Sequence, residues 1–170
     1  PEAQDAEYVS ISRWVELESA VYEIAITANG APIEQALIGP LDIVLEGGQW
    51  NTIAVVFNQE LNSLIARIVR EDYSPIPEGS GRITFFHAVP DAPSLDIAIN
   101  QQVFINALTF PGNQPSRPNG AASITLGAGP IDIEIRETDN LQNVYIQLRD
   151  VELRPGDHYF IAAVNNVSTI

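Results

Sequence analysis

The sequence predicts an all-β fold with two immunoglobulin-like antiparallel β-sandwich modules in tandem. Apolar and polar residues alternate in short runs along most of the 170 residues, as they do in half-buried strands. Turn dipeptides such as Asn29-Gly30 and Gly47-Gly48 separate these runs. No stretch keeps the 3.6-residue period of an amphipathic helix, so we expect strands throughout.

The alternating runs place the strands in order along the chain. In the first half they predict strands at 8–17, 22–27, 35–45 (as two short pieces), 50–57 and 64–69. In the second half they predict a hairpin at 82–100 and strands at 103–110, 123–126, 131–136, 144–153 and 158–164.

An internal repeat relates the two halves. Residues 14–26 (WVELESAVYEIAI) align without a gap with residues 123–135 (SITLGAGPIDIEI). Residues 41–56 (LDIVLEGGQWNTIAVV) align with residues 149–164 (RDVELRPGDHYFIAAV), after a slip of one residue between the two blocks. The apolar positions keep the same parity, so the same face of each strand points inward in both copies.

The two copies differ in extent. Nothing in residues 1–13 corresponds to the hairpin at 82–100, so the first copy lacks an opening hairpin. Nothing after residue 164 corresponds to the strand at 64–69, so the second copy lacks a final strand. The predicted first module, Pro/Gly-rich linker and second module are residues 1–74, 75–81 and 82–170.

The second half opens with residues 82–99, RITFFHAVPDAPSLDIAI, which predict a strand, a turn and a second strand. An Asp between two prolines is a favoured turn residue, because its side chain accepts hydrogen bonds from nearby backbone N–H groups. A metal-binding or acid–base role would need the polar side chains to converge, and we favour a structural role. The predicted structural turn motif consists of His87, Pro90, Asp91, Pro93 and Asp96.

The stretch HAVPDAPSLDI at 87–97 resembles the HASPDAP-type opening of the DUF4397 family, a group of tandem β-modules in secreted proteins. The preceding segment, SLIARIVREDYSPIPEGSGRITFF, is similar to that family's junction between one repeat and the next. The resemblance implies an extracellular β-sandwich with no established activity. It supplies no catalytic residues.

Composition narrows the possible functions. The formal net charge of -14 repels phosphate backbones, so nucleic acid is not an expected partner. The absence of Cys excludes disulfides, thiolate metal sites and a cysteine nucleophile. Apolar runs such as 53–57 are far shorter than the ~20 residues of a membrane-spanning helix, so no transmembrane segment is expected. We predict no enzyme activity, catalytic residue, cofactor or metal site.

Other polar and aromatic residues have structural interpretations. The two histidines of the chain, His87 and His158, do not make a His-rich zinc site. Asp132 and Glu134 share one face of a predicted strand, but no calcium-loop pattern surrounds them, and calcium binding stays open. A sugar-stacking platform is a further possibility, although core or interface positions are favoured for the tryptophans. Its aromatic residues would be Tyr8, Trp14, Tyr22, Trp50 and Tyr73.

The missing strands predict a non-enzymatic structural subunit of the cell surface or of an extracellular assembly. An incomplete sandwich exposes a strand edge and part of its core, and a strand from a neighbour would repair both. Identical head-to-tail contacts that do not close would produce a filament. The expected partner is therefore a second copy or a neighbouring surface protein. The candidate donor strand is Tyr8, Val9, Ser10, Ile11 and Ser12.

Two alternatives remain open. The chain could be a cell-surface adhesin or carbohydrate-binding module that uses exposed aromatic residues and the loop at 111–120. It could also be a fragment of a longer tandem-repeat surface protein whose other strands complete both modules.

Overall fold

The computed structural model describes residues 10–58, 61–90, 92–110 and 120–164. These residues form strands and one short 3-10 turn, η1 (Ile33–Gln35), which confirms the predicted all-β class. None of the described segments forms a helix long and apolar enough to span a bilayer. The strands are β1 (Ala20–Ile26), β2 (Ile38–Leu45), β3 (Trp50–Asn58), β4 (Ser63–Glu71), β5 (Ser80–His87), β6 (Leu95–Ile99), β7 (Gln102–Leu108), β8 (Ala121–Gly127), β9 (Gly129–Glu137), β10 (Asn140–Leu153) and β11 (His158–Ala163).

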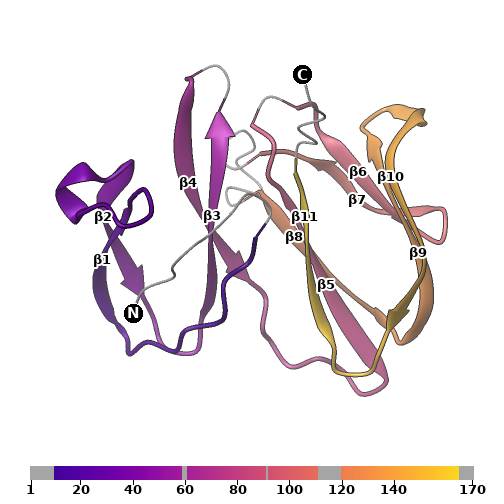
Figure 1. The fold of residues 1–170 in the computed structure, drawn as a ribbon. Coiled ribbons are helices and arrows are strands. Elements are labelled where there is room, and N and C mark those ends of the chain that lie inside the picture. Colours follow the sequence, from indigo (N-terminus) through magenta and orange to yellow (C-terminus); the bar gives the residue numbers. More distant parts are fainter. Residues whose placement is uncertain (1–9, 59–60, 91, 111–119, 165–170) are drawn as a thin grey trace.

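The first half consists of two antiparallel hairpins that stand face to face (Figure 1). β1 pairs with β2, and β3 pairs with β4. Ile24 lies opposite Leu41 in the first hairpin, and Ile53 lies opposite Ile68 in the second. Cross-strand partners share a face of the sheet, so each hairpin presents an aliphatic face to the other.

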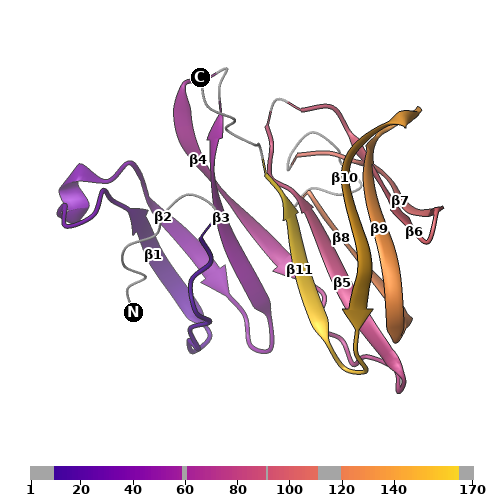
Figure 2. The same ribbon diagram turned by 45° about the vertical axis from the view of Figure 1, so that its right-hand side comes forward.

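The second half is a β-sandwich of two sheets, seen side by side in Figure 2. One sheet has the order β10-β9-β6-β7 and the other has the order β11-β5-β8. Six of the seven strand pairings in the described residues are antiparallel, as predicted. The pair β11–β5 is parallel, which differs from the prediction. Because β11 crosses over from β10 of the opposite sheet, it enters the three-stranded sheet in the direction of β5. The predicted hairpin at 82–100 is also wrong: both strands form, but β5 and β6 lie in different sheets and the turn between them crosses from one sheet to the other.

The main core lies between the two sheets of the sandwich. Ile83 and Phe85 of β5 are buried there against Ile97 of β6 and Ile133 of β9. The alternating apolar residues predicted on these strands thus point inward from both sheets. The buried members of this core are Ile83, Phe85, Leu95, Ile97, Ile99, Ile105, Leu108, Ile131, Ile133, Ile135 and Leu153.

The two halves meet through the outer face of β5. Phe86 of β5 is buried together with Val69 of β4, and Ala54 and Val56 of β3 pack against them. β5 is therefore covered on one side by its own sandwich and on the other side by the β3–β4 hairpin. This explains why nearly every residue of β5 is buried, including polar Thr84.

One predicted strand is not formed. Residues 10–18 contain no strand, and residues 8–9 lie outside the described residues. The repeat explains this difference. Residues 14–18 correspond to part of β8, and in the second half β8 forms a strand by pairing with β5. In the described residues the first half holds no counterpart of β5, so this segment has no strand to pair with.

The equivalent strand pairs β1–β2 and β9–β10 have matching registers at one position of the repeat. Ile43 lies opposite Tyr22, just as Val151 lies opposite Ile131 at the equivalent positions. Beyond this point the register of β10 shifts at a β-bulge between Leu148 and Val151. The bulge adds one residue to β10 relative to β9, and the β1–β2 pair has a register shift of its own between Ile24 and Ile26.

Candidate functional site

The predicted turn motif is held together by a buried histidine. His87 has no exposed surface, its Nε2 donates to the Pro93 carbonyl at 3.0 Å, and its Nδ1 accepts from the Val89 N–H at 3.3 Å. These two bonds fix a neutral ring, and burial lowers the pKa of His87. Both partners are backbone groups of the turn. Asp91 lies outside the described residues.

Asp96 organises a different part of the sandwich. It is buried in β6, and its Oδ1 accepts hydrogen bonds from the Asn106 Nδ2, the Ala107 N–H and the Thr138 Oγ1, at 3.1, 2.9 and 2.8 Å. The carboxylate thereby joins β6 to β7 and to the end of β9. Within the described residues no three His, Asp or Glu side chains are placed to hold a metal ion.

The tryptophans lie at the seam between the two halves. The Trp50 ring stacks on Tyr73 with centroids 4.2 Å apart, and Trp14 meets Trp50 edge-on at 5.0 Å. Tyr73 in turn lies over His158, at 4.3 Å. The rings cover one another's faces, which suits an interface more than a sugar platform. Tyr22 lies elsewhere, bonding the Glu18 carbonyl, and Tyr8 is outside the described residues.

A polar pair is buried beneath these rings. Glu71 at the end of β4 accepts a hydrogen bond from Thr52 on Oε1, but its buried Oε2 has no hydrogen-bond partner. His158 at the start of β11 bonds Thr84 through Nε2 at 2.8 Å, and that nitrogen is 3.9 Å from Glu71 Oε2. Burial raises the pKa of Glu71 and lowers the pKa of His158. Both directions favour the neutral forms of the two side chains.

The raised pKa of Glu71 predicts that this side chain makes the free energy of unfolding fall as pH rises. Its favourable contribution is complete below the unfolded-state pKa and is lost as pH rises through the higher folded-state pKa. Replacement of Glu71 by Gln should therefore stabilise the fold at pH 8, by on the order of 1 kcal/mol, and have less effect at pH 4. Urea unfolding of both proteins across this pH range measures the difference.

Glu134 is a control whose contribution to the free energy of unfolding changes with pH in the opposite direction. It pairs with Arg136, which holds the pKa of Glu134 below its usual value. Its contribution is present at neutral pH and is lost as pH falls. Glu134→Gln should therefore weaken the fold at pH 7 and converge with the wild type in acid. If the free energy of unfolding of Glu71→Gln varied with pH in the same way as that of the wild type, burial would not raise the pKa of Glu71 as we infer.

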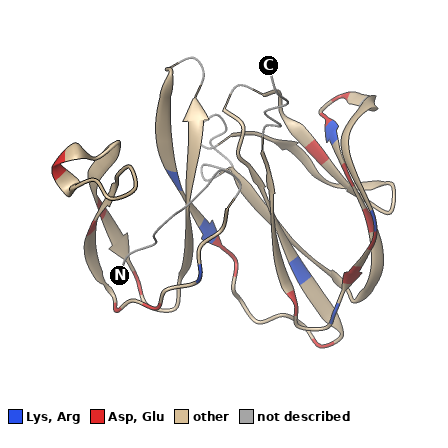
Figure 3. Cartoon of the chain, viewed as in Figure 1, with Lys and Arg blue, Asp and Glu red and all other residues tan. Residues whose placement is uncertain are grey.

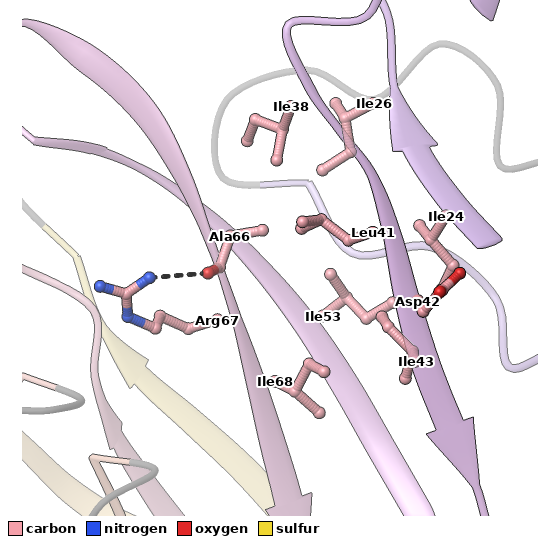
Figure 4. Close-up of a pocket in the computed structure, with 10 residues that line it drawn as sticks. All are labelled: Ile24, Ile26, Ile38, Leu41, Asp42, Ile43, Ile53, Ala66, Arg67 and Ile68. Atoms are coloured by element: carbon pink, nitrogen blue, oxygen red, sulfur yellow. Dashed lines mark hydrogen bonds between the residues drawn. The ribbon is translucent and has the colours of Figure 1, made fainter. Parts of the chain in front are cut away.

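An apolar groove lies between the two hairpins of the first half. Figure 4 shows aliphatic side chains from all four strands facing a hollow of about 280 Å³. Ile43 is buried, but Leu41 is 48% exposed and both Ile53 and Ile68 are 37% exposed. The groove is lined by Ile24, Ile26, Ile38, Leu41, Asp42, Ile43, Ile53, Ala66, Arg67 and Ile68.

The second half shows what normally covers these positions. Ile24 and Ile26 correspond by the repeat to Ile133 and Ile135, which are fully buried in the sandwich. There, β5 supplies side chains from the opposite sheet, and β6 pairs beside β9 in the same sheet. The described residues of the first half hold no counterparts of these two strands, so the groove is a sandwich core left open on one side.

A second opening lies at the far side of the sandwich. The sheet β11-β5-β8 has three strands and faces a sheet of four, with β11 and β10 each at an edge. Ile146 and Leu148 of β10 lie opposite the buried Ile135 and Ile133, and therefore point to the core side. They are nonetheless 37% and 38% exposed.

The start of the described chain contributes an exposed apolar residue. Ile11, in the candidate donor strand, is 85% exposed, and neighbouring Ser10 and Ser12 are also exposed. Tyr8 and Val9 lie outside the described residues. Acidic residues are spread over both halves rather than gathered on one face (Figure 3). The openings are thus apolar features of a generally acidic surface.

Comparison with known proteins gives one family. A family model described as Domain of unknown function (DUF4397) matches residues 2–98 and, again, residues 81–170. The double match confirms the tandem resemblance found in the sequence. Both matches include residues 81–98, which hold β5, the turn after it and most of β6, so this segment ends one match and opens the next. No curated protein and no solved structure matches the chain.

Proposed function

The chain belongs to the DUF4397 family, whose description assigns no function. From the geometry of the chain itself, we propose that it is a non-enzymatic extracellular structural subunit. In this proposal, copies assemble head-to-tail into a surface filament or layer by β-strand complementation. The extracellular location rests on the likeness of HAVPDAPSLDI to the opening motif of secreted repeats.

The open sandwich core of the first half is the observation that carries the proposal. Its aliphatic lining is half-exposed, although the equivalent side chains of the second half are buried by β5 and β6. Burying apolar surface is worth about 25 cal/mol per Å², so an uncovered core is a strong drive to association. Exposed strand edges beside it add backbone groups that another strand would pair.

The positions of the openings favour an open chain of subunits. One opening belongs to the first half and the other to the second half, so the two surfaces are different. A contact between unlike surfaces is heterologous, and it extends indefinitely unless its rotation closes a ring. We assign this contact to arm 1–13, which carries the exposed Ile11.

Removal of the arm tests this proposal. We expect the full chain to form polymers visible by negative-stain electron microscopy, and a variant lacking residues 1–13 to stay monomeric by size-exclusion light scattering. Ile11→Asp should have the same effect without unfolding the subunit, because Ile11 is 85% exposed. Ile33→Asp, at an exposed position outside the arm and both openings, is the matched control. A full chain that stays monomeric at high concentration would contradict the proposal.

A further inference from the structure

We infer that the arm of one copy pairs with the outer edge of β11 in a second copy, an edge that no strand among the described residues occupies, and becomes the fourth strand of the sheet β11-β5-β8. This inference rests on the proposed function and identifies which of the two openings receives the arm. The acceptor surface consists of the β11 edge and the uncovered core side of β10.

The acceptor sheet has one strand fewer than the sheet that it faces. Sheet β11-β5-β8 faces a sheet with one more strand, and the edge strand β10 keeps Ile146 and Leu148 uncovered on its core side. One additional strand beside β11 would lie over these two side chains. The groove of the first half differs, because the residues described there hold no counterpart of β5, β6 or β7. A single-stranded arm therefore matches the opening at β11, whereas the groove calls for a hairpin.

The first half contains the same arrangement already completed. β3 corresponds to β11 by the repeat, with Ile53 at the place of Ile161. β4 pairs antiparallel with β3, and its Ile68 lies across the groove from Ile43 of β2. β2 corresponds to β10, so β4 stands where the missing strand beside β11 would stand. By analogy with β4 and β3, we expect the arm to pair antiparallel with β11.

The arm has the pattern that this position requires. The inward face of β4 carries Ala66 and Ile68, two residues apart, and both line the groove. Val9 and Ile11 have the same spacing in the arm, with serines between and after them. Setting Ile11 at the place of Ile68 brings it opposite Ile161 of the second copy.

The same register places Val9 opposite Ala163 and Ser10 opposite Ala162. Ile161 and Ala163 pack toward the core of the sandwich, so both apolar arm residues would enter that core. Ala162 packs on the other face, against the β3–β4 hairpin, and Ser10 would lie on that face as well.

Disulfide trapping tests this register, because the native chain contains no cysteine. We would mix two single-cysteine variants of the full chain, Ser10→Cys and Ala162→Cys, and oxidise them. Directly opposed residues of paired strands have Cβ atoms about 5 Å apart, close to disulfide range. The expected result is a disulfide-linked heterodimer, absent when either variant is oxidised alone and lost when the donor also carries Ile11→Asp.

A second acceptor separates this inference from the proposed function. Leu41→Cys places the thiol at the exposed rim of the first-half groove. Heterodimers with Leu41→Cys but not with Ala162→Cys would overturn the β11 assignment and leave strand complementation in place. An intrachain disulfide in a monomeric Ser10→Cys/Ala162→Cys double variant would overturn pairing between copies. Polymers of the cysteine-free chain, without crosslinking at either acceptor, would overturn the β11 assignment alone.

Discussion

Replacement of Ile133 by Ala is expected to lower the free energy of unfolding by about 3 kcal/mol, within the usual range for a large-to-small change in a closed core. The same change at Ile24, its counterpart in the repeat, is expected to cost only about 1 kcal/mol in an isolated copy. Ile133 is fully buried between two sheets, whereas Ile24 borders the open groove and already contacts solvent on one side. Urea denaturation of the two variants, under conditions that prevent assembly, gives both values.

The pair of variants also reports whether the groove becomes covered. Ile26→Ala and Ile135→Ala repeat the comparison one inward position further along the strands and serve as the matched set. If assembly closes the groove, the cost at Ile24 should rise toward the cost at Ile133 in the polymer. Equal costs in the isolated copy would contradict the open core, because they would mean that Ile24 is as well packed as Ile133.

Replacement of Arg82 by Ala is expected to cost about 3 kcal/mol. The Arg82 side chain is buried in β5 and donates to the carbonyls of Asp72 and Ser74, at 2.8 and 2.7 Å, and to Thr125 Oγ1 at 3.1 Å. Hydrogen bonds from a charged donor contribute about 1.5–3 kcal/mol each, and their loss leaves acceptors unpaired. The guanidinium thus ties the connection after β4 to the first strand of the sandwich. Chemical unfolding measures the cost.

Two further variants separate the geometry of Arg82 from its charge. Arg82→Lys keeps the charge but cannot reach the same acceptors in a planar fork, so an intermediate loss is expected. Arg149→Ala removes an exposed arginine whose ion pair with Asp132 spans 3.5 Å, and it should change stability by less than about 1 kcal/mol. A cost at Arg82 no greater than that at Arg149 would show that the buried bonds do not hold the two halves together.

Local sequence patterns predicted most of the individual elements. Period-2 alternation located the strands around Ile53 and Ile133, and the turn residues from His87 to Pro93 located the turn between β5 and β6, although not the fact that these strands enter different sheets. These signals work because a strand with one buried face alternates, and because turns need particular residues. The repeat also indicated which positions point inward in both halves.

Other features depended on contacts between distant segments. The segment 10–18 alternates like a strand but forms none, since strands require a hydrogen-bonding neighbour that the sequence pattern does not provide. The parallel placement of β11 follows from a crossover between sheets, and the site at Glu71 and His158 joins residues from β4 and β11. Neither spacing nor composition signals such meetings.

The sequence by itself therefore determined that this protein is a tandem of β-strand repeats with unequal ends, because periodicity and repetition are properties of the chain. Only the tertiary structure decided which side chains those unequal ends leave uncovered. Ile24 and Ile133 occupy matching places in the repeat, yet one borders an open groove and the other is buried. The difference arises because burial depends on the strands around a residue, and in the second half β5 packs across from Ile133 while β6 pairs beside it.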